Sequence, residues 1–438
     1  MLKAGFARID ITPPLGASVS GYFRERFADA ILDPLLATAV AFDDGKKRAV
    51  VISCDLIGFN MIYADRIRPL IAELIQTEIE GVFICCTHTH LGPGTIEDNQ
   101  VVVEHNRDYI EWLVKKLCDV AVLAVQDLAP AKLSYTRGEV KNVAFVRRFR
   151  MKDGSVRTNP GMQNPDVVCA LGTPDENTSL LIIKREGAPE IGIVNFQVHP
   201  DVIAGNALSA DYPKFVRDTY ELLIPNSRCM YINGAQGDTN HVDVRLSLDD
   251  CCRGYDRARY MGRKIAMSVV ANYELAQALE GDEVNYGQKS IFVKYNKGRP
   301  DQMEEAIRIN KLYTEGGIEA IGPESMGMRR TEIVAEAGRI VELMDYPDEK
   351  ELYLTAVRVG DFVVAGFPGE PFTDIGRGIK ANSKFTLTMP SCCANGYEGY
   401  YPMQSAFDEG GYEALTARYV AGTAEKLIEA STEIVNAL

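Results

Sequence analysis

Two histidines one residue apart follow an apolar run in the segment FICCTHTHLGPG, residues 83–94. They are His88 and His90, and the whole chain contains only five histidines. On an extended segment, side chains at i and i+2 point to the same side, so one or both imidazoles could address a single ion. An HxH pair also arises by chance, so support must come from elsewhere in the sequence.

Three further β-like runs end in polar residues. The run 191–198 ends in His199, the run 228–233 leads into the loop from Asn233 to Asp238, and the run 361–367 precedes Glu370. In an α/β sheet, sites lie beyond the carboxyl ends of the strands. Four such ends in one chain predict a site at one edge of the sheet.

Zinc is the ion that these residue types favour. It accepts imidazole and carboxylate ligands in tetrahedral geometry, and a catalytic site uses about three protein ligands while keeping a position for water. His88, His199 and Glu370 would supply such a set. A histidine before proline at a strand end is also consistent with a simple cap, so each motif alone is weak.

Other candidates keep two interpretations. Asp55, at a strand end, could orient an imidazole or lie in a solvated loop. His105, in VVVEHNRDY, fits a helix entry better than a ligand, and His241, just behind GAQGDTN, fits either role.

The elements that must position these residues alternate along the chain. RAVVISCDLIGF (48–59) and GVFICCTHTH (81–90) predict strands, while segments 63–78 and 107–128 have apolar residues at helical spacing. This βαβα order predicts an α/β fold with a central, largely parallel or mixed sheet flanked by helices.

Later segments continue this pattern. Residues 179–200 and 352–371 predict hairpins, and 228–238 a strand leaving into a glycine-rich loop. A charged, helical excursion at about 297–348 interrupts the strands. We expect one domain over residues 1–438, because no linker or repeat divides the chain.

Composition limits the partners. The net charge is −14, and no cluster of Lys and Arg is long enough to form a basic stripe, which argues against nucleic acid and anionic membranes. No window approaches a membrane helix, and the N-terminus has no signal-peptide pattern. We therefore expect a cytoplasmic protein without stable membrane association that acts on a small molecule; a homo-oligomer stays open.

Six motifs in order resemble the catalytic domain of the neutral (non-lysosomal) ceramidase family. They are GFARIDITPPLG, THTHLGPG, VHP, NGAQGD, PGE and NGYEGYYPMQSAFDEGGYEA, and they extend from about residue 3 to about residue 420. The resemblance implies a zinc-dependent amidase that cleaves an N-acyl bond.

The resemblance also implies roles for individual residues. The metal ligands would be His88, His199, Glu370 and Tyr400; an aromatic in a surface loop is the alternative for Tyr400. His90, Tyr412 and an arginine would line the reacting centre. VRRFR offers Arg147 for that arginine, with Arg148 as its competitor.

The chain departs from the family at one position. Ceramidases carry a serine in a GDxS motif, and here Asn240 occupies that place, with the Thr239 hydroxyl one position away. The chain also ends near the end of the catalytic domain, without the C-terminal β-domain and the secretion signal of ceramidases. We therefore expect a substrate other than ceramide.

A mechanism remains without the serine. Zinc-bound water has a pKa of about 7 and is already a nucleophile. His90 or Asp238 could carry its proton, while Arg147, Tyr412 and Asn240 donate hydrogen bonds to the oxyanion. The sequence thus predicts a zinc-dependent hydrolase of an amide or ester bond.

The substrate class is a separate hypothesis. Arg147, Arg148 and Arg150 near the site favour a small soluble acid or a polar acylated compound, and Gly21, Tyr22 and Arg24 in SGYFRER could form a substrate wall. Two alternatives stay open: a metal enzyme of another class, such as a lyase or glycosidic-bond hydrolase, and a non-catalytic binding protein.

Overall fold

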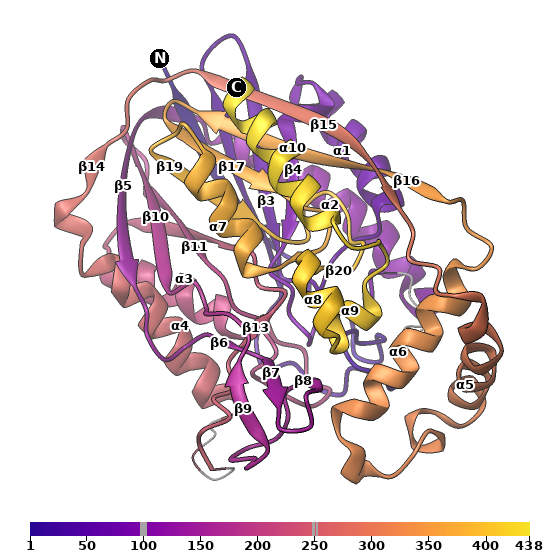
Figure 1. Cartoon of the computed structure of the whole chain (residues 1–438). Helices are drawn as coiled ribbons and strands as arrows, with labels where there is room; N and C mark the ends of the chain where they lie inside the picture. The colour runs from indigo at the N-terminus through magenta and orange to yellow at the C-terminus, as the bar shows by residue number, and fades with distance from the viewer. Residues whose placement is uncertain (97–102, 248–249, 251–252) are drawn as a thin grey trace.

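The computed structural model describes residues 1–96, 103–247, 250 and 253–438. Within these ranges two sheets pack face to face, one of nine strands and one of four (Figure 1). The larger sheet runs in the order β12 (Ser227–Asn233), β11 (Glu190–Phe196), β10 (Asn177–Arg185), β5 (Ala129–Glu139), β1 (Lys3–Asp10), β2 (Leu36–Asp43), β3 (Arg48–Cys54) and β4 (Val82–Cys86), with β14 (Gln277–Ala278) beside β5.

The smaller sheet runs in the order β15 (Val284–Lys294), β16 (Glu349–Val359), β17 (Phe362–Gly366) and β19 (Leu387–Ser391). Parallel pairs are β3 with β4, β11 with β12, and β17 with β19; the other pairs in these two sheets are antiparallel. Both sheets are therefore mixed, and a mixed sheet is one of the two arrangements that the sequence predicted for this α/β fold.

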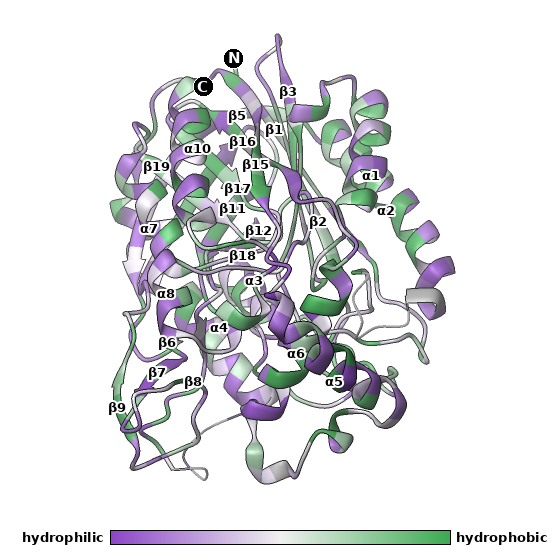
Figure 2. Cartoon of the chain, turned by 45° about the vertical axis from the view of Figure 1, so that its right-hand side comes forward, coloured by the Kyte–Doolittle hydropathy of each residue, from purple (hydrophilic) through white to green (hydrophobic). Residues whose placement is uncertain are grey.

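Helices cover the outer faces of both sheets, giving four layers. The helices α1 (Met61–Ile75) and α2 (Arg107–Gln126) pack on β1 to β3, and α3 (Tyr212–Leu223) and α4 (Tyr255–Val270) pack on β10 to β12. On the smaller sheet lie α7 (Thr373–Asn382) and α10 (Thr423–Ala437). Figure 2 shows hydrophobic residues concentrated in the strands between these layers.

The predicted βαβα order is confirmed by β3, α1, β4 and α2. Parallel pairing sets Val50 opposite Val82, and the helical spacing of Ile67, Ile71 and Ile75 buries one face of α1. Both strands end earlier than expected, at Cys54 and Cys86. The polar residues therefore lie in loops beyond the strands.

The larger sheet is curled, so its two edge strands approach each other. Ser53 Oγ in β3 donates a hydrogen bond to the Tyr231 carbonyl in β12 at 2.6 Å, and Asn233 Nδ2 donates to the Thr87 carbonyl at 3.0 Å. The carboxyl ends of β4 and β12 consequently meet, with β11 next to β12, although β4 and β12 are the two edge strands in the sheet order.

The helical excursion lies between β15 and β16, as predicted. It contains α5 (Met303–Gly316) and α6 (Met328–Leu343), which pack side by side through Ala306, Ile309, Ala337 and Ile340 (Figure 1). The assignment of residues 1–438 to a single domain stays a prediction. Of the described helices, none is long and apolar enough to cross a bilayer.

Short elements frame the carboxyl edge. They are β6 (Phe145–Val146), β7 (Arg148–Met151), β8 (Val156–Thr158), β9 (Val167–Ala170), β13 (Thr239–Asn240), β18 (Glu370–Pro371), β20 (Tyr400–Tyr401), α8 (Gln404–Glu409) and α9 (Tyr412–Thr416).

Candidate metal centre

His88 and His90 lie in the loop after β4, and this loop is not extended. His88 has a φ of 72°, in the left-handed region, so the expected i, i+2 geometry of a strand is wrong. The turn still brings the two rings together, with centroids 5.1 Å apart. A residue at such a φ is held there by its surroundings, and this is common at functional sites.

Glu370 and Tyr400 reach the site through a short parallel pairing. The strands β18 and β20 pair in a register that sets Glu370 opposite Tyr400. Gly237 lies against this pair so closely that a Cβ there would come within 2.5 Å of the Glu370 carbonyl oxygen. The glycine of the NGAQGD loop is therefore required for packing beside Glu370.

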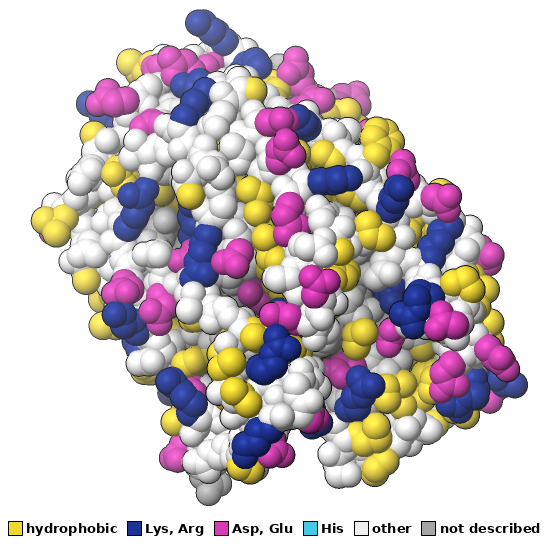
Figure 3. All heavy atoms as spheres, in the orientation of Figure 1, with side chains coloured by type: hydrophobic (Ala, Val, Ile, Leu, Met, Phe, Trp, Pro, Cys, Tyr) yellow, Lys and Arg dark blue, Asp and Glu magenta, His cyan; other side chains and the backbone are white. Residues whose placement is uncertain are grey.

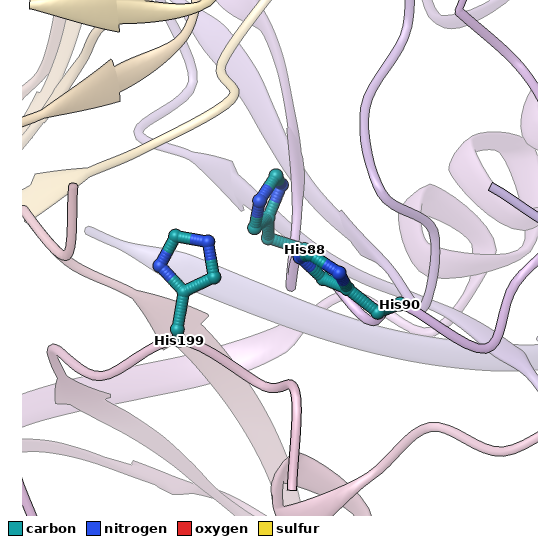
Figure 4. Close-up of side chains that lie close together, drawn as sticks. All are labelled: His88, His90 and His199. Atoms are coloured by element: carbon teal, nitrogen blue, oxygen red, sulfur yellow. The ribbon is translucent and has the colours of Figure 1, made fainter. Parts of the chain in front are cut away.

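Three imidazoles and one carboxylate converge at the centre. Nε2 of His88 and Nε2 of His199 each lie 3.2 Å from the same oxygen, Oε2 of Glu370. One ring nitrogen from each of His88, His90 and His199 lies within 4.8 Å of the others (Figure 4). This three-histidine cluster could hold a metal ion.

Hydrogen bonds fix which nitrogen of His88 can act as a ligand. Its Nδ1 lies 2.7 Å from the Ile57 carbonyl oxygen, which can only accept, so Nδ1 carries the proton and Nε2 presents its lone pair. In His199, Nδ1 lies 3.3 Å from the Gln236 carbonyl oxygen. Two neutral imidazole lone pairs facing one carboxylate oxygen would repel it, and a shared cation would relieve this repulsion.

The charge states agree with a cation site. Burial, with a further contribution from Arg147, lowers the pKa of His199 well below its usual value, which keeps the ring neutral. Burial alone would raise the pKa of Glu370, but the neighbouring histidines and the Tyr397 hydroxyl outweigh it and the pKa falls. Neutral imidazoles and an ionised carboxylate are the forms that bind zinc.

His90 faces the same centre from its other side. Among the described residues neither of its buried ring nitrogens has a hydrogen-bond partner, and burial lowers its pKa to about 4. Its Nδ1 lies 4.0 Å from Asp201 Oδ1, and Asp201 accepts a hydrogen bond from the Tyr22 hydroxyl. The ring packs so closely on Gly21 that a Cβ there would approach Nδ1 to 2.6 Å.

Arg147 points toward the centre, whereas Arg148 points away from it. The Arg147 guanidinium carbon lies 5.3 Å from the Tyr400 ring centroid, and its Nε donates to Glu413 Oε1 at 2.7 Å. Its Nη2 donates to the Gly237 carbonyl at 2.8 Å. Arg148 instead bonds Glu409 and the Gly410 carbonyl.

Asp238 and Asn240 are occupied by other bonds. Asp238 Oδ1 accepts hydrogen bonds from the backbone N and the hydroxyl of Thr373, at the start of α7. Asn240 donates to Asn159 Oδ1 at 2.8 Å and accepts from the Val242 backbone N. Neither side chain lines the two cavities described next, so the structure does not place Asp238 or Asn240 at the centre.

Two cavities adjoin the centre. The first, of about 530 Å³, is lined by His90, Arg147, His199 and Tyr400, together with Tyr22 and Arg24 of the predicted substrate wall. It runs between the β8 end and the α5–α6 segment, where Figure 3 shows a hollow in the surface. Figure 3 also shows acidic and basic side chains interspersed over this face.

The second cavity, of about 430 Å³, lies behind an aromatic partition. Phe23, Tyr400 and Tyr412 line both cavities, and ring centroids of Tyr412 lie 5.7 Å from Tyr400 and 6.4 Å from Phe23. Apolar residues such as Met61 and Val334 form much of the second wall.

The remaining candidates lie outside the centre. Asp55 is fully buried and forms a two-bond ion pair with Arg217, at 2.7 and 2.8 Å, so it is neither solvated nor an imidazole partner. His105 lies at the entry to α2 with its ring against Phe27. His241 is buried, and neither of its ring nitrogens has a hydrogen-bond partner in the part of the chain that the structure describes.

Several residues that contact the site were not predicted. Tyr397 donates to Glu370, Glu413 holds Arg147, and Asp201 faces His90. Two had a signal in the sequence, since Asp201 follows the VHP motif directly and Tyr397 shares the NGYEGYY segment with Tyr400. Glu413 follows Tyr412 in the same motif, but its pairing with Arg147, 266 residues away, had no signal in the sequence.

Comparisons with known proteins identify the fold. Across the whole chain the structure resembles the neutral ceramidase from Pseudomonas aeruginosa, with a TM-score of 0.74, 18% identity and coverage of 74% of that chain. A structure of a ceramidase complexed with C2 is similar at a TM-score of 0.72 and 17% identity, over 75% of its chain. No family model and no curated sequence matches. The chain therefore has a ceramidase-like fold.

Proposed function

We propose that the protein is a zinc-dependent hydrolase that cleaves an amide (N-acyl) or ester bond in a small, soluble substrate. The observation that carries this proposal is that Nε2 of His88 and Nε2 of His199 each lie 3.2 Å from the same oxygen of Glu370. The likeness to two ceramidases, whose name denotes cleavage of ceramide, supports amide chemistry on this fold. We assign His88, His199, Glu370 and Tyr400 as ligands.

The chain's own residues supply the remaining functions. Bound zinc would lower the pKa of water to about 7 and polarise a carbonyl. Next to the metal, His90 lines the first cavity, packs on Gly21, and has its Nδ1 4.0 Å from Asp201 Oδ1. In this position it could receive a proton and return it to the leaving group.

Arg147 is placed to stabilise the oxyanion. Its bonds to Glu413 and Gly237 use Nε and Nη2, and the guanidinium also lies against Tyr400. Burial would lower its pKa, but Tyr400, Glu413 and Glu370 raise it, so the guanidinium stays charged. Tyr412 also lines this cavity and could donate its hydroxyl. Asp238 and Asn240 are left out of the proposed mechanism because their side chains are bonded elsewhere.

The test is metal analysis of the purified protein followed by a panel of small N-acyl amides and esters. We expect near-unit zinc and hydrolysis that stops when zinc is chelated and returns when it is restored. Arg147→Gln should lower kcat by roughly 100-fold or more with zinc retained. Arg148→Gln, which changes the neighbouring buried arginine, should lower the thermal stability of the protein and have a smaller effect on kcat than Arg147→Gln. A protein without zinc, or a zinc protein inactive on every panel member, would contradict the proposal.

A further inference from the structure

A pair of asparagines connects the position of the expected serine to the first cavity. Asn240, which occupies that position, lines neither cavity, but its Nδ2 donates a 2.8 Å hydrogen bond to Oδ1 of Asn159. Asn159 directly follows β8 and lines the first cavity. The side chain at position 240 can therefore act on a bound substrate through Asn159.

Hydrogen-bond chemistry fixes the orientation of both amides. The Val242 backbone N can only donate, so the Asn240 atom that it meets at 3.0 Å must be the oxygen Oδ1. The NH2 group of Asn240 then faces Asn159, and Asn159 must present its own oxygen to it. The group of Asn159 that is left over is Nδ2, a donor, and no described residue accepts a hydrogen bond from it.

The backbone holds Asn159 in this position. Its φ is 48°, in the left-handed region, which asparagine adopts more readily than most residues. Its backbone N donates to the Arg147 carbonyl at 2.9 Å, and the preceding Thr158 donates from Oγ1 to Glu413 at 2.8 Å. Glu413 is also the carboxylate that holds the Arg147 guanidinium. The Asn159 donor is thus fixed next to the segment that carries Arg147.

The first cavity must receive the leaving half of the substrate. His90, which is proposed to return a proton to the leaving group, lines the first cavity and not the second. The leaving group therefore lies in the cavity that Asn159 also lines. A donor that loses its water to a ligand without gaining an acceptor is costly, so such a site selects ligands that carry an oxygen at that place.

We propose that Asn159 is a specificity-determining residue, which donates from Nδ2 to an uncharged oxygen on the leaving half of the substrate, and that Asn240 is the positioning residue that fixes this donor. This inference rests on the proposed function. Arg148 and Arg150, which the sequence offered as the basis for an acidic substrate, pair with Glu409 and so do not support an acidic group. Position 240 acts on substrate selection and takes no part in bond cleavage.

The test compares N-acetylaminoacetone with N-isobutylacetamide, using the zinc-loaded full chain. Both amides are uncharged, and their leaving amines differ in a carbonyl oxygen that the second replaces by a methyl group. We expect kcat/KM of the wild type to be higher for the ketone by roughly 3- to 10-fold, as for one uncharged hydrogen bond. Asn159→Asp still accepts from Asn240 but has no donor, so the ratio should fall to about one or below.

Asn240→Asp tests the positioning role separately. Its carboxylate still accepts from the Val242 backbone but cannot donate to Asn159, so the Asn159 amide should turn over and present its oxygen to the cavity. The preference for the ketone should be lost, although position 240 lines neither cavity. A merely structural residue would change stability and leave the ratio unchanged. If the buried charge prevents folding, Asn159→Asp still decides the proposal.

The matched control is Asn164→Asp, which adds the same charge in the segment between β8 and β9. Asn164 is also bonded through both groups of its amide and lines neither cavity, so the wild-type ratio should be kept. Zinc content and thermal unfolding of each variant separate loss of binding from loss of the fold.

Two kinds of failure are distinguishable. A wild type without preference for the ketone, or a preference that survives Asn159→Asp, would overturn the role of Asn159 and leave the hydrolase standing. Activity on the panel of amides and esters without any on the ketone would do the same. Inactivity of the zinc-loaded wild type on both compounds and on the whole panel would contradict the proposed function and this inference with it.

Discussion

The Tyr397 hydroxyl donates a 2.6 Å hydrogen bond to Oε1 of Glu370, the oxygen that does not face the two histidines. One oxygen of the carboxylate is thus held by the protein, and the other faces Nε2 of His88 and of His199. The Tyr397 ring also stacks on His88, with centroids 5.9 Å apart. Tyr397 therefore positions two of the proposed ligands at once.

Removing this hydroxyl should weaken zinc binding. Tyr397→Phe keeps the ring but frees Oε1, and loss of such an outer contact lowers metal affinity by roughly 10- to 100-fold. The measurement is competition for zinc with a chromophoric chelator. Tyr401→Phe is the control, because Tyr401 is buried in the same segment but donates to the Pro368 carbonyl. Equal affinities of the two variants would show that Tyr397 does not orient Glu370.

The roles of His88 and His90 can be separated by zinc content. His88→Ala removes a proposed ligand and should abolish bound zinc with the fold retained. His90→Ala should keep zinc near unit stoichiometry but lose activity, because His90 is proposed to carry protons. His105→Ala, at the entry to α2, should change neither. Loss of zinc in His90→Ala would instead make the three clustered histidines the ligand set.

Sequence reasoning located the strands because burial imposes a simple pattern on them. The apolar runs that became β3 and β4 and the helical spacing of α1 are local properties, and they predicted the βαβα unit. The sequence could not reveal that β12 approaches β3, because this depends on how far the larger sheet curls. That curl is what brings His199 to His88.

The site was predicted less completely, because it also depends on contacts between segments that are distant in the sequence. His88, His199 and Glu370 are found by their type and their place after strands, and the structure brings them together. Side-chain direction is set by tertiary contacts. Arg147 faces the centre because Glu413 and Gly237 hold it, while its neighbour Arg148 faces Glu409. Asp238 instead accepts a hydrogen bond from the Thr373 hydroxyl at the start of α7, and no local sequence pattern predicts this contact.

Acid should destabilise the protein partly through His241. Burial lowers its pKa to about 4 from 6.5, with Asp201 opposing this and Arg253 and Arg257 adding to it. Between these two values the unfolded chain binds more protons than the folded one, so stability falls as pH falls through this window. The contribution is on the order of 3 kcal/mol.

The test is His241→Phe, which puts an apolar ring in place of an imidazole that forms no hydrogen bond with the described residues. Chemical unfolding should give similar free energies of unfolding for the variant and the wild type above pH 6.5. Between pH 6.5 and about 4 the free energy of unfolding should fall less for the variant than for the wild type. His90 and His199 have pKa values shifted the same way and stay in both proteins, so the difference between the two curves isolates His241. Parallel curves would mean that His241 is not held neutral by burial.

Phe23 should limit the length of the acyl group. Its ring closes the partition between the cavities of about 530 and 430 Å³, against Tyr412 on one side and Tyr313, with centroids 6.5 Å apart, on the other. Phe23→Ala opens a path from the zinc site to the apolar wall of the second cavity. Each further methylene buried there contributes about 0.8 kcal/mol, so the ratio of kcat/KM for N-dodecanoyl over N-acetyl substrates should rise by roughly tenfold or more. Phe27→Ala, an exposed ring of the same loop that lines neither cavity, should leave the ratio unchanged. If opening the partition does not raise the ratio, the second cavity does not receive the acyl chain.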